Sequence, residues 1–320
     1  MLDSSPLFPA RDPDAQGWLY RDHGHRVYWE VSGPPHGIPV VVFHGGPGSG
    51  ASRAHGRFFD PDRFQVVLFD QRGCGRSLPL GGLAANTTAH LVADAEALRH
   101  HLRLGPWWVM GGSWGAALAL AYAATHRASC RGLLLRGVFL TGHRDLDWFF
   151  HGAGTLLPEA HAAFLAPVPR TRRRNPLAWY AKVFAGDDAP AADRAVARWR
   201  AWEGAMQAPS HPPPAMEVDP VQSAVLRAKY RIQSAYLQRR CFLGEAAVLD
   251  CAARIHGLPT TLLHGRLDLI CRPINAWRVH RTLHGSQLAW VDDAGHDPFS
   301  PAMAQAMVAA TEAIARATGP

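Results

Sequence analysis

The segment Gly111-Gly112-Ser113-Trp114-Gly115 has a serine at its centre. A glycine lies two residues before this serine and another lies two residues after it. An apolar run precedes this segment and an Ala/Leu-rich stretch follows it, which predicts a strand, a sharp turn and a helix. In such a turn the serine has a strained backbone, and its hydroxyl lies near a helix N-terminus that favours negative charge. The pattern therefore predicts a nucleophile, Ser113, and requires a base, an acid and oxyanion donors elsewhere in the chain.

Two late strands supply candidates for the base and the acid. Residues 258–264 and 286–291 are short apolar runs, and the loops after them contain Asp268 and His296. Parallel strands end at the same edge of a sheet, so these side chains should meet the serine there. The chain order Ser113, Asp268, His296 predicts a triad in which His296 is the base and Asp268 fixes its tautomer. Three other carboxylates are less favoured as the acid because they are too close in sequence to His296: Asp292, Asp293 and Asp297.

The first buried strand, residues 39–43, runs into the loop His44-Gly45-Gly46-Pro47-Gly48-Ser49-Gly50. With so few side chains, the N–H groups of this loop can approach a ligand closely. We assign the oxyanion hole to the N–H groups of Gly46 and Trp114. After the next strand, residues 65–69, Asp70 and Arg72 are expected to form a partly buried ion pair that holds the turn beside this loop.

Composition excludes several other classes of protein. The 320 residues are 48% hydrophobic and 18% charged, enough for a large globular core. The net charge of +7 includes the run Arg170–Arg174, which we interpret as a solvated face because nothing typical of nucleic-acid binding accompanies it. The five cysteines include no C-x-x-C pair, and we expect no disulfide framework, metal or cofactor. With no signal peptide or membrane-length apolar run, the expected location is the cytoplasm.

The strands and helices are typical of an α/β fold with an inserted unit. Between about residues 140 and 244 the chain is rich in Arg, Ala, Trp and Pro, with helical periodicity and no convincing strand. We therefore predict a first part of the sheet domain over residues 1–140, a helical cap over 141–245, and a second part of the sheet domain over 246–320.

Several motifs together resemble the prolyl iminopeptidase family, and the resemblance covers nearly the whole chain. They are His44-Gly-Gly-Pro-Gly, Asp70-Gln-Arg-Gly-Cys-Gly-Arg-Ser77, Gly111-Gly-Ser-Trp-Gly115, Leu135-Arg-Gly137, His264-Gly-Arg-Leu-Asp268, Asn275-Ala-Trp277 and Gly295-His296. The resemblance implies an α/β-hydrolase fold with a mostly parallel sheet flanked by helices and an inserted helical cap. It also implies a metal-free serine aminopeptidase that releases N-terminal proline through an acyl-enzyme.

By the same resemblance the cap should bind the substrate. Glu203 matches a family glutamate that binds the substrate amine, although an exposed cap glutamate is the alternative. Gln233 stands where the family has a second glutamate. Phe139, Trp148 and Phe149 could form an apolar slot for the proline ring, or belong to the core of the cap.

The expected substrate is a small peptide, or an amino-acid amide or ester; the oligomeric state stays open. Because Gln233 has no charge, an esterase or amidase for an uncharged acyl substrate is the alternative function. A non-catalytic binding protein is the third and least favoured class.

Overall fold

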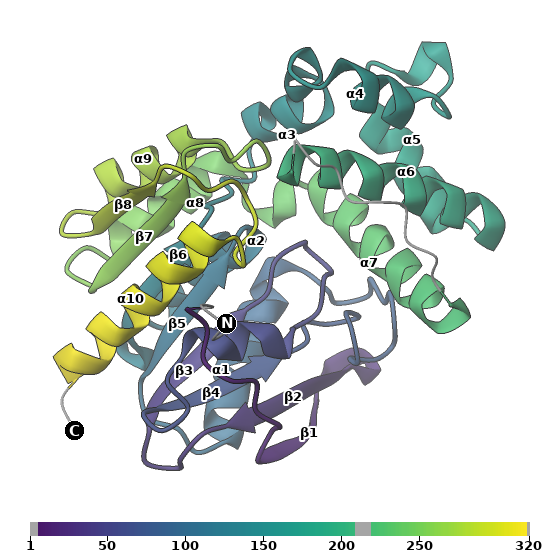
Figure 1. Ribbon diagram of the computed structural model, residues 1–320. Helices are drawn as coiled ribbons and strands as arrows, with labels where there is room; N and C mark the ends of the chain where they lie inside the picture. The colour runs from purple at the N-terminus through teal and green to yellow at the C-terminus, as the bar shows by residue number, and fades with distance from the viewer. Residues whose placement is uncertain (1–5, 209–218, 319–320) are drawn as a thin grey trace, which may run out of the picture.

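The computed structural model describes residues 6–208 and 219–318, and its centre is one eight-stranded sheet (Figure 1). The strand order is β1-β2-β4-β3-β5-β6-β7-β8. β1 and β2 are antiparallel to their neighbours, and the strands from β4 to β8 are parallel. The strands are β1 Ala15–Tyr20, β2 Arg26–Ser32, β3 Ile38–Phe43, β4 Phe64–Phe69, β5 Trp107–Gly112, β6 Cys130–Arg136, β7 Thr260–Gly265 and β8 Gln287–Val291. The predicted mostly parallel sheet is confirmed.

The central strands are continuous apolar runs because both faces of the sheet are buried. Successive side chains alternate between the faces. Val41 and Phe43 of β3 pack in the core on one face, whereas Val40 and Val42 pack in a second core on the other. The first core includes helices α1 Thr88–His101, α2 Trp114–Thr125, α8 Gly244–Arg254 and α9 Pro273–Thr282; the second includes α10 Pro301–Thr318.

In the described part of the chain, five further α-helices lie between β6 and α8, and Figure 1 shows them grouped at one side of the sheet. They are α3 His143–Phe150, α4 Pro158–Leu165, α5 Pro176–Ala185, α6 Ala189–Gln207 and α7 Pro220–Gln238, and we call them the cap helices. Trp199 and Trp202 of α6 are fully buried among aromatic rings from α3, α4, α5 and α7. Much of the aromatic content of this segment therefore forms its own core. The division of the chain at residues 140 and 245 into domains stays a prediction.

The ion pair expected between Asp70 and Arg72 does not form. Asp70 instead binds Arg76, with 2.7 Å between Oδ2 and Nε, and its Oδ1 accepts a hydrogen bond from the N–H of Ala51. Arg72 forms a bidentate pair with Asp94 of α1, with N–O distances of 2.6 and 2.7 Å. The prediction was wrong because it considered only partners within the same loop, and a buried arginine can reach a carboxylate on a packed helix.

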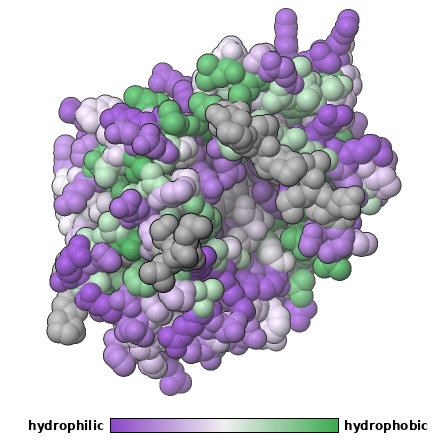
Figure 2. All heavy atoms as spheres, viewed as in Figure 1, coloured by the Kyte–Doolittle hydropathy of each residue, from purple (hydrophilic) through white to green (hydrophobic). Residues whose placement is uncertain are grey.

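Among the described residues, no helix has both the length and the apolarity needed to cross a membrane. On the face shown in Figure 2, hydrophilic residues are widely spread and hydrophobic residues occur in small groups.

Candidate active site

Ser113 occupies the turn between β5 and α2 with φ 58° and ψ −122°. Left-handed φ is strained for a residue with a side chain, and it persists here because the surroundings fix the turn. The N–H of Ser113 donates to the carbonyl of Arg136 on β6 at 2.9 Å. A Cβ atom on Gly111 would overlap the carbonyl of Gly115, and one on Gly115 would overlap the carbonyl of Phe43. The two flanking glycines are therefore required for strand, turn and helix to pack this closely.

His296 and Asp268 meet beyond the carboxyl ends of β8 and β7. His296 Nδ1 lies 2.7 Å from Asp268 Oδ2. The other carboxylate oxygen accepts hydrogen bonds from the N–H groups of Ile270 and Cys271, at 3.0 and 2.8 Å. Burial acts to raise the pKa of Asp268, but the charges of His296 and His264 and these hydrogen bonds outweigh it and hold the pKa below its usual value. Asp268 is thus a buried, ionised carboxylate that can orient the imidazole.

Ser113 and His296 line the same cavity, but their side chains are not hydrogen-bonded to each other in this structure. The polar atom recorded near Ser113 Oγ is Cys271 Sγ, at 3.8 Å. Catalytic hydrogen bonds are often long or misaligned without substrate and tighten when it binds. The proton transfer from Ser113 to His296 therefore stays a prediction.

The glycine loop after β3 is tied to the nucleophile turn through Gln71. Gln71 donates its side-chain amide to the carbonyl of His44 at 2.9 Å and accepts from the indole of Trp114 at 3.0 Å. Gly46 has φ +113°, which favours glycine, and it lines the cavity with Ser113. Trp114 is the first residue of α2, so its N–H has no acceptor within the helix. These observations are compatible with the predicted oxyanion pair, which stays a prediction.

The cavity has a volume of about 260 Å³ and lies between the strand ends and the cap helices. Of the five residues expected to bind substrate, four line it: Phe139, Phe149, Glu203 and Gln233. Trp148 is not among the lining residues, and its indole N–H donates to the carbonyl of Leu269 at 2.7 Å. Trp148 thus connects α3 to the loop after β7, and we no longer assign it to the apolar slot.

Glu203 is surrounded by donors rather than free in solvent. Its Oε1 accepts from the indole of Trp199 at 3.0 Å and from the amide of Gln233 at 2.8 Å. Its Oε2 accepts from the hydroxyl of Tyr230 at 2.7 Å, and Lys229 Nζ lies 3.7 Å away. The amide oxygen of Gln233 is buried and has no hydrogen-bond partner among the described residues.

Three residues near the site were not predicted. Arg136 donates through Nη1 to the carbonyl of His296 at 2.7 Å and so holds the histidine loop. Gly137 has φ +57°, and a Cβ there would lie 3.3 Å from both Asp268 Oδ2 and His296 Nδ1. Lys229 lies four residues before Gln233 on α7, so helical spacing places both side chains on one face. This spacing could have indicated that Lys229 lies near the site.

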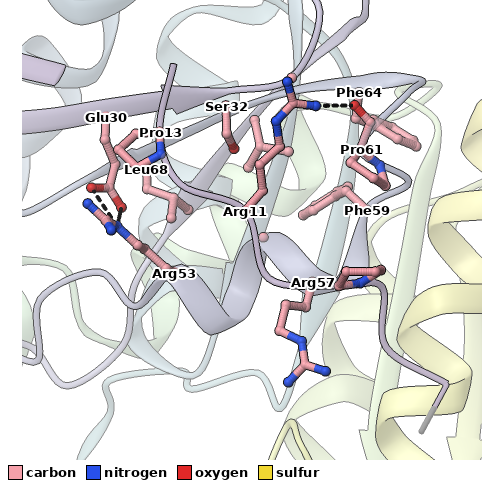
Figure 3. A pocket seen from close by; sticks show the side chains of 14 residues that line it. Arg11, Pro13, Glu30, Ser32, Arg53, Arg57, Phe59, Pro61, Phe64 and Leu68 are labelled. Atoms are coloured by element: carbon pink, nitrogen blue, oxygen red, sulfur yellow. Dashed lines mark hydrogen bonds and ion pairs between the residues drawn. The ribbon is translucent and has the colours of Figure 1, made fainter. Parts of the chain in front are cut away.

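A second cavity lies against β2 and β4 and contains none of the triad (Figure 3). Its volume is about 30 Å³, room for only one or two water molecules. Glu30 and Arg53 form an ion pair in its wall, with both Oε atoms 3.2 Å from Nε. It is too small for a substrate. The described residues also include no group of three or more His, Cys, Asp or Glu side chains able to hold a metal ion.

Acid should destabilise the fold partly through His55, which lines the catalytic cavity. Burial lowers the pKa of His55 to about 4. An unfolded histidine has a pKa of about 6.5, so between these values the unfolded chain binds a proton that the folded chain excludes. Stability should therefore fall as the pH falls from about 6.5 to about 4.

Urea midpoints measured across this range test the effect of His55. In His55→Gln the urea midpoint should fall less steeply with decreasing pH than in the wild type. His36→Gln, which changes an exposed histidine, is the control and should leave this pH dependence unchanged. An unchanged slope in His55→Gln would contradict the prediction.

Known proteins resemble this chain in sequence and in fold. The family model described as alpha/beta hydrolase fold matches residues 38–301. A proline iminopeptidase of Xylella fastidiosa is 39% identical over 96% of this chain and 99% of that protein, and one of Neisseria gonorrhoeae is 38% identical over 96% and 98%. One of Arabidopsis thaliana is 38% identical over 97% of this chain and 82% of that protein.

Solved structures match at lower identity. VinJ has a TM-score of 0.64 at 20% identity, covering 94% of this chain and 99% of VinJ. An esterase from Exiguobacterium antarcticum has a TM-score of 0.61 at 17% identity, covering 94% of this chain and all of the esterase. At these identities the likeness concerns the fold alone.

Proposed function

Because the chain belongs to the proline iminopeptidase family within the α/β-hydrolase fold, we propose that it is a serine aminopeptidase that releases N-terminal proline from small peptides. The observation that carries the proposal is a single cavity lined by Ser113 and His296 from the sheet and by Glu203 from the cap helices. A carboxylate in the same cavity as the nucleophile suits a substrate whose ammonium is next to the scissile bond. The volume of about 260 Å³ suits a small acyl residue.

In the first step Ser113 Oγ attacks the prolyl carbonyl carbon while His296 Nε2 takes the hydroxyl proton. The carbonyl oxygen becomes an oxyanion, which the N–H groups of Gly46 and Trp114 stabilise. His296 then gives its proton to the departing amine, and an acyl-enzyme remains. A water molecule then attacks the ester carbonyl while His296 takes its proton. The bond to Ser113 Oγ breaks, His296 returns the proton to that oxygen, and proline leaves.

Asp268 takes part in these reaction steps through His296. Its carboxylate accepts from Nδ1, which leaves Nε2 free to take the serine proton, and its charge stabilises the imidazolium that follows. Because nearby charge and hydrogen bonds lower the pKa of Asp268 despite its burial, the carboxylate stays ionised while the histidine cycles.

A cytoplasmic location is part of the same proposal. The five cysteines are buried and unpaired, which is usual in a reducing compartment.

Three substrates test the proposal: proline 4-nitroanilide, its N-acetyl derivative and 4-nitrophenyl acetate. An aminopeptidase should cleave the first far faster than the second. The second candidate, an esterase or amidase for uncharged acyl groups, is favoured by the neutral Gln233 beside Glu203 and predicts the reverse preference. Turnover of the ester alone would overturn the aminopeptidase proposal.

Glu203→Gln should lower kcat/KM for proline 4-nitroanilide by roughly tenfold, mainly through KM. A charge pair near a protein surface contributes up to about 4 kcal/mol, of which desolvation offsets most. Steady-state kinetics on proline 4-nitroanilide and 4-nitrophenyl acetate checks this, and ester turnover should change little. An unaltered preference for the free amine would remove Glu203 from substrate binding.

Gln233→Glu is the complementary change. It replaces a donor at 2.8 Å from Glu203 with a second carboxylate, and two carboxylates in contact favour sharing a proton. We expect KM for proline 4-nitroanilide to fall about fivefold, about 1 kcal/mol. Steady-state kinetics on proline 4-nitroanilide and 4-nitrophenyl acetate measures the change, and the ester should not gain.

A further inference from the structure

Lys229 lies in the cavity at the position where an amine-binding site needs negative charge. Its side chain is 22% exposed, and its Nζ is 3.7 Å from Glu203 Oε2 and 4.9 Å from the ring centroid of Tyr230. It is one of only two lysines in the chain, and the other, Lys182, is exposed on α5. Lys229 and Gln233 are one helical turn apart on α7, and both line the cavity.

Glu203 already has three hydrogen-bond donors and one neighbouring cation. A carboxylate has two oxygens and about four lone-pair sites. Trp199 and Gln233 donate to Oε1, and Tyr230 and Lys229 approach Oε2. The remaining acceptor position is on Oε2, and a substrate ammonium that approaches it competes with the charge of Lys229.

Lys229 is the partner of Glu203 that is most easily displaced. The three hydrogen-bond donors lie within 3.0 Å of a carboxylate oxygen, whereas Lys229 Nζ forms only an ion pair at 3.7 Å on a long flexible side chain. Trp199 and Tyr230 are fully buried and Gln233 is 5% exposed, so they are held by packing.

The charges that line the cavity also cancel. Its charged lining residues, apart from histidines, are Arg136, Lys229, Asp145 and Glu203. Asp145 is already paired with Arg272, at 2.9 Å. Among the described residues that line the cavity, Glu203 is thus the carboxylate left to attract a substrate amine, and Lys229 pairs with it.

We propose that Lys229 is a specificity-determining residue that acts as an internal counter-ion of Glu203. Its charge makes the amine-binding part of the cavity electrically neutral. Acyl groups without a charged amine are therefore accepted as well as N-terminal proline. This inference rests on the proposed function for the position of the amine. Its chemistry is simple exchange of one cation for another, since the substrate ammonium gains the attraction of Glu203 only by moving the lysine away. The gain from binding a charged amine is correspondingly small.

The test uses two ligands of the same shape, L-prolinamide and cyclopentanecarboxamide, which differ in the ring amine. Their dissociation constants are measured by calorimetry on Ser113→Ala protein, with and without Lys229→Met, at pH 6.5 where an α-amino group is mostly protonated. Lys229→Met keeps a long side chain and removes the charge. We expect it to strengthen prolinamide binding by roughly tenfold and to leave cyclopentanecarboxamide binding within twofold.

Two further variants separate charge from packing. Lys229→Arg keeps the charge and should bind both ligands as the parent does. Lys182→Met removes the other lysine and should change neither constant. The inference is overturned if Lys229→Met leaves the preference for prolinamide over cyclopentanecarboxamide unchanged. It is also overturned if Lys229→Arg increases this preference as much as Lys229→Met does.

Failure of the proposed function gives a different result. In that case wild-type protein does not hydrolyse proline 4-nitroanilide, whatever the binding ratio. A hydrolysis assay and the binding assay therefore report on the two proposals separately.

Discussion

Ser113→Ala should lower kcat on proline 4-nitroanilide by about four to six orders of magnitude. The hydroxyl is the only protein group in the proposed mechanism that forms a bond to the acyl carbon, so no other side chain can substitute for it. His296→Ala should cause a loss of similar size, because an uncharged serine hydroxyl is a weak nucleophile without its base. The measurement is steady-state kinetics at high enzyme concentration, with urea unfolding to show that each variant is folded.

The double variant Ser113→Ala/His296→Ala shows whether the two residues contribute to turnover together or independently. If Ser113, His296 and Asp268 act together, Ser113→Ala/His296→Ala should be little worse than either single variant. Ser223→Ala, a serine of α7 outside the cavity lining, is the matched control and should be fully active. Near-normal turnover by folded Ser113→Ala would exclude the assignment.

The features predicted well from sequence are those that depend on local pattern. The strands around Val41 and Val67 are continuous apolar runs because each is buried on both faces, and their limits were predicted to within a residue or two. The turn at Ser113 was predictable because Gly111 and Gly115 are required by contacts within one strand–turn–helix unit.

Features that depend on contacts between distant segments were missed. Strand β1 pairs only with β2 at the edge of the sheet, and its short sequence has no strong alternation. Trp148 was assigned to the substrate slot from its type alone, but its indole bonds to a carbonyl 121 residues further along the chain. The position of Lys229 beside Glu203 depends on how α6 and α7 pack, which no local pattern specifies.

The partner of Arg72 was also predicted wrongly, because it lies on a distant segment of the chain. This partner is Asp94, and we expect its removal to lower the stability of the fold strongly. Arg72 and Asp94 have side chains that are each 1% exposed, and they form two parallel hydrogen bonds. Two charges buried this deeply are tolerated only as a pair. Breaking such a pair leaves an uncompensated charge in the core.

Asp94→Ala should therefore lower the free energy of unfolding by about 3–5 kcal/mol. Asp22 cannot replace the lost carboxylate fully, since it is 48% exposed and binds only one nitrogen of Arg72. Asp250→Ala is the matched control: it breaks the exposed pair with Arg254 and should cost less than about 1 kcal/mol. Urea unfolding of both variants measures the difference.

The double variant Asp94→Leu/Arg72→Met tests whether the cost comes from the stranded charge rather than from the lost contacts. Replacing both partners with apolar side chains removes both deeply buried charges, and such replacements are often neutral or stabilising. Arg21, the other partner of Asp94 at 2.7 Å, is 27% exposed and can be solvated. The double variant should therefore be more stable than Asp94→Ala, even though it has lost every hydrogen bond of the pair. If Asp94→Ala costs no more than Asp250→Ala, the pair does not hold α1 against the turn after β4, and the stability of that turn must come from the hydrogen bonds of Arg72 to Asp22 and to the carbonyl of Ala85.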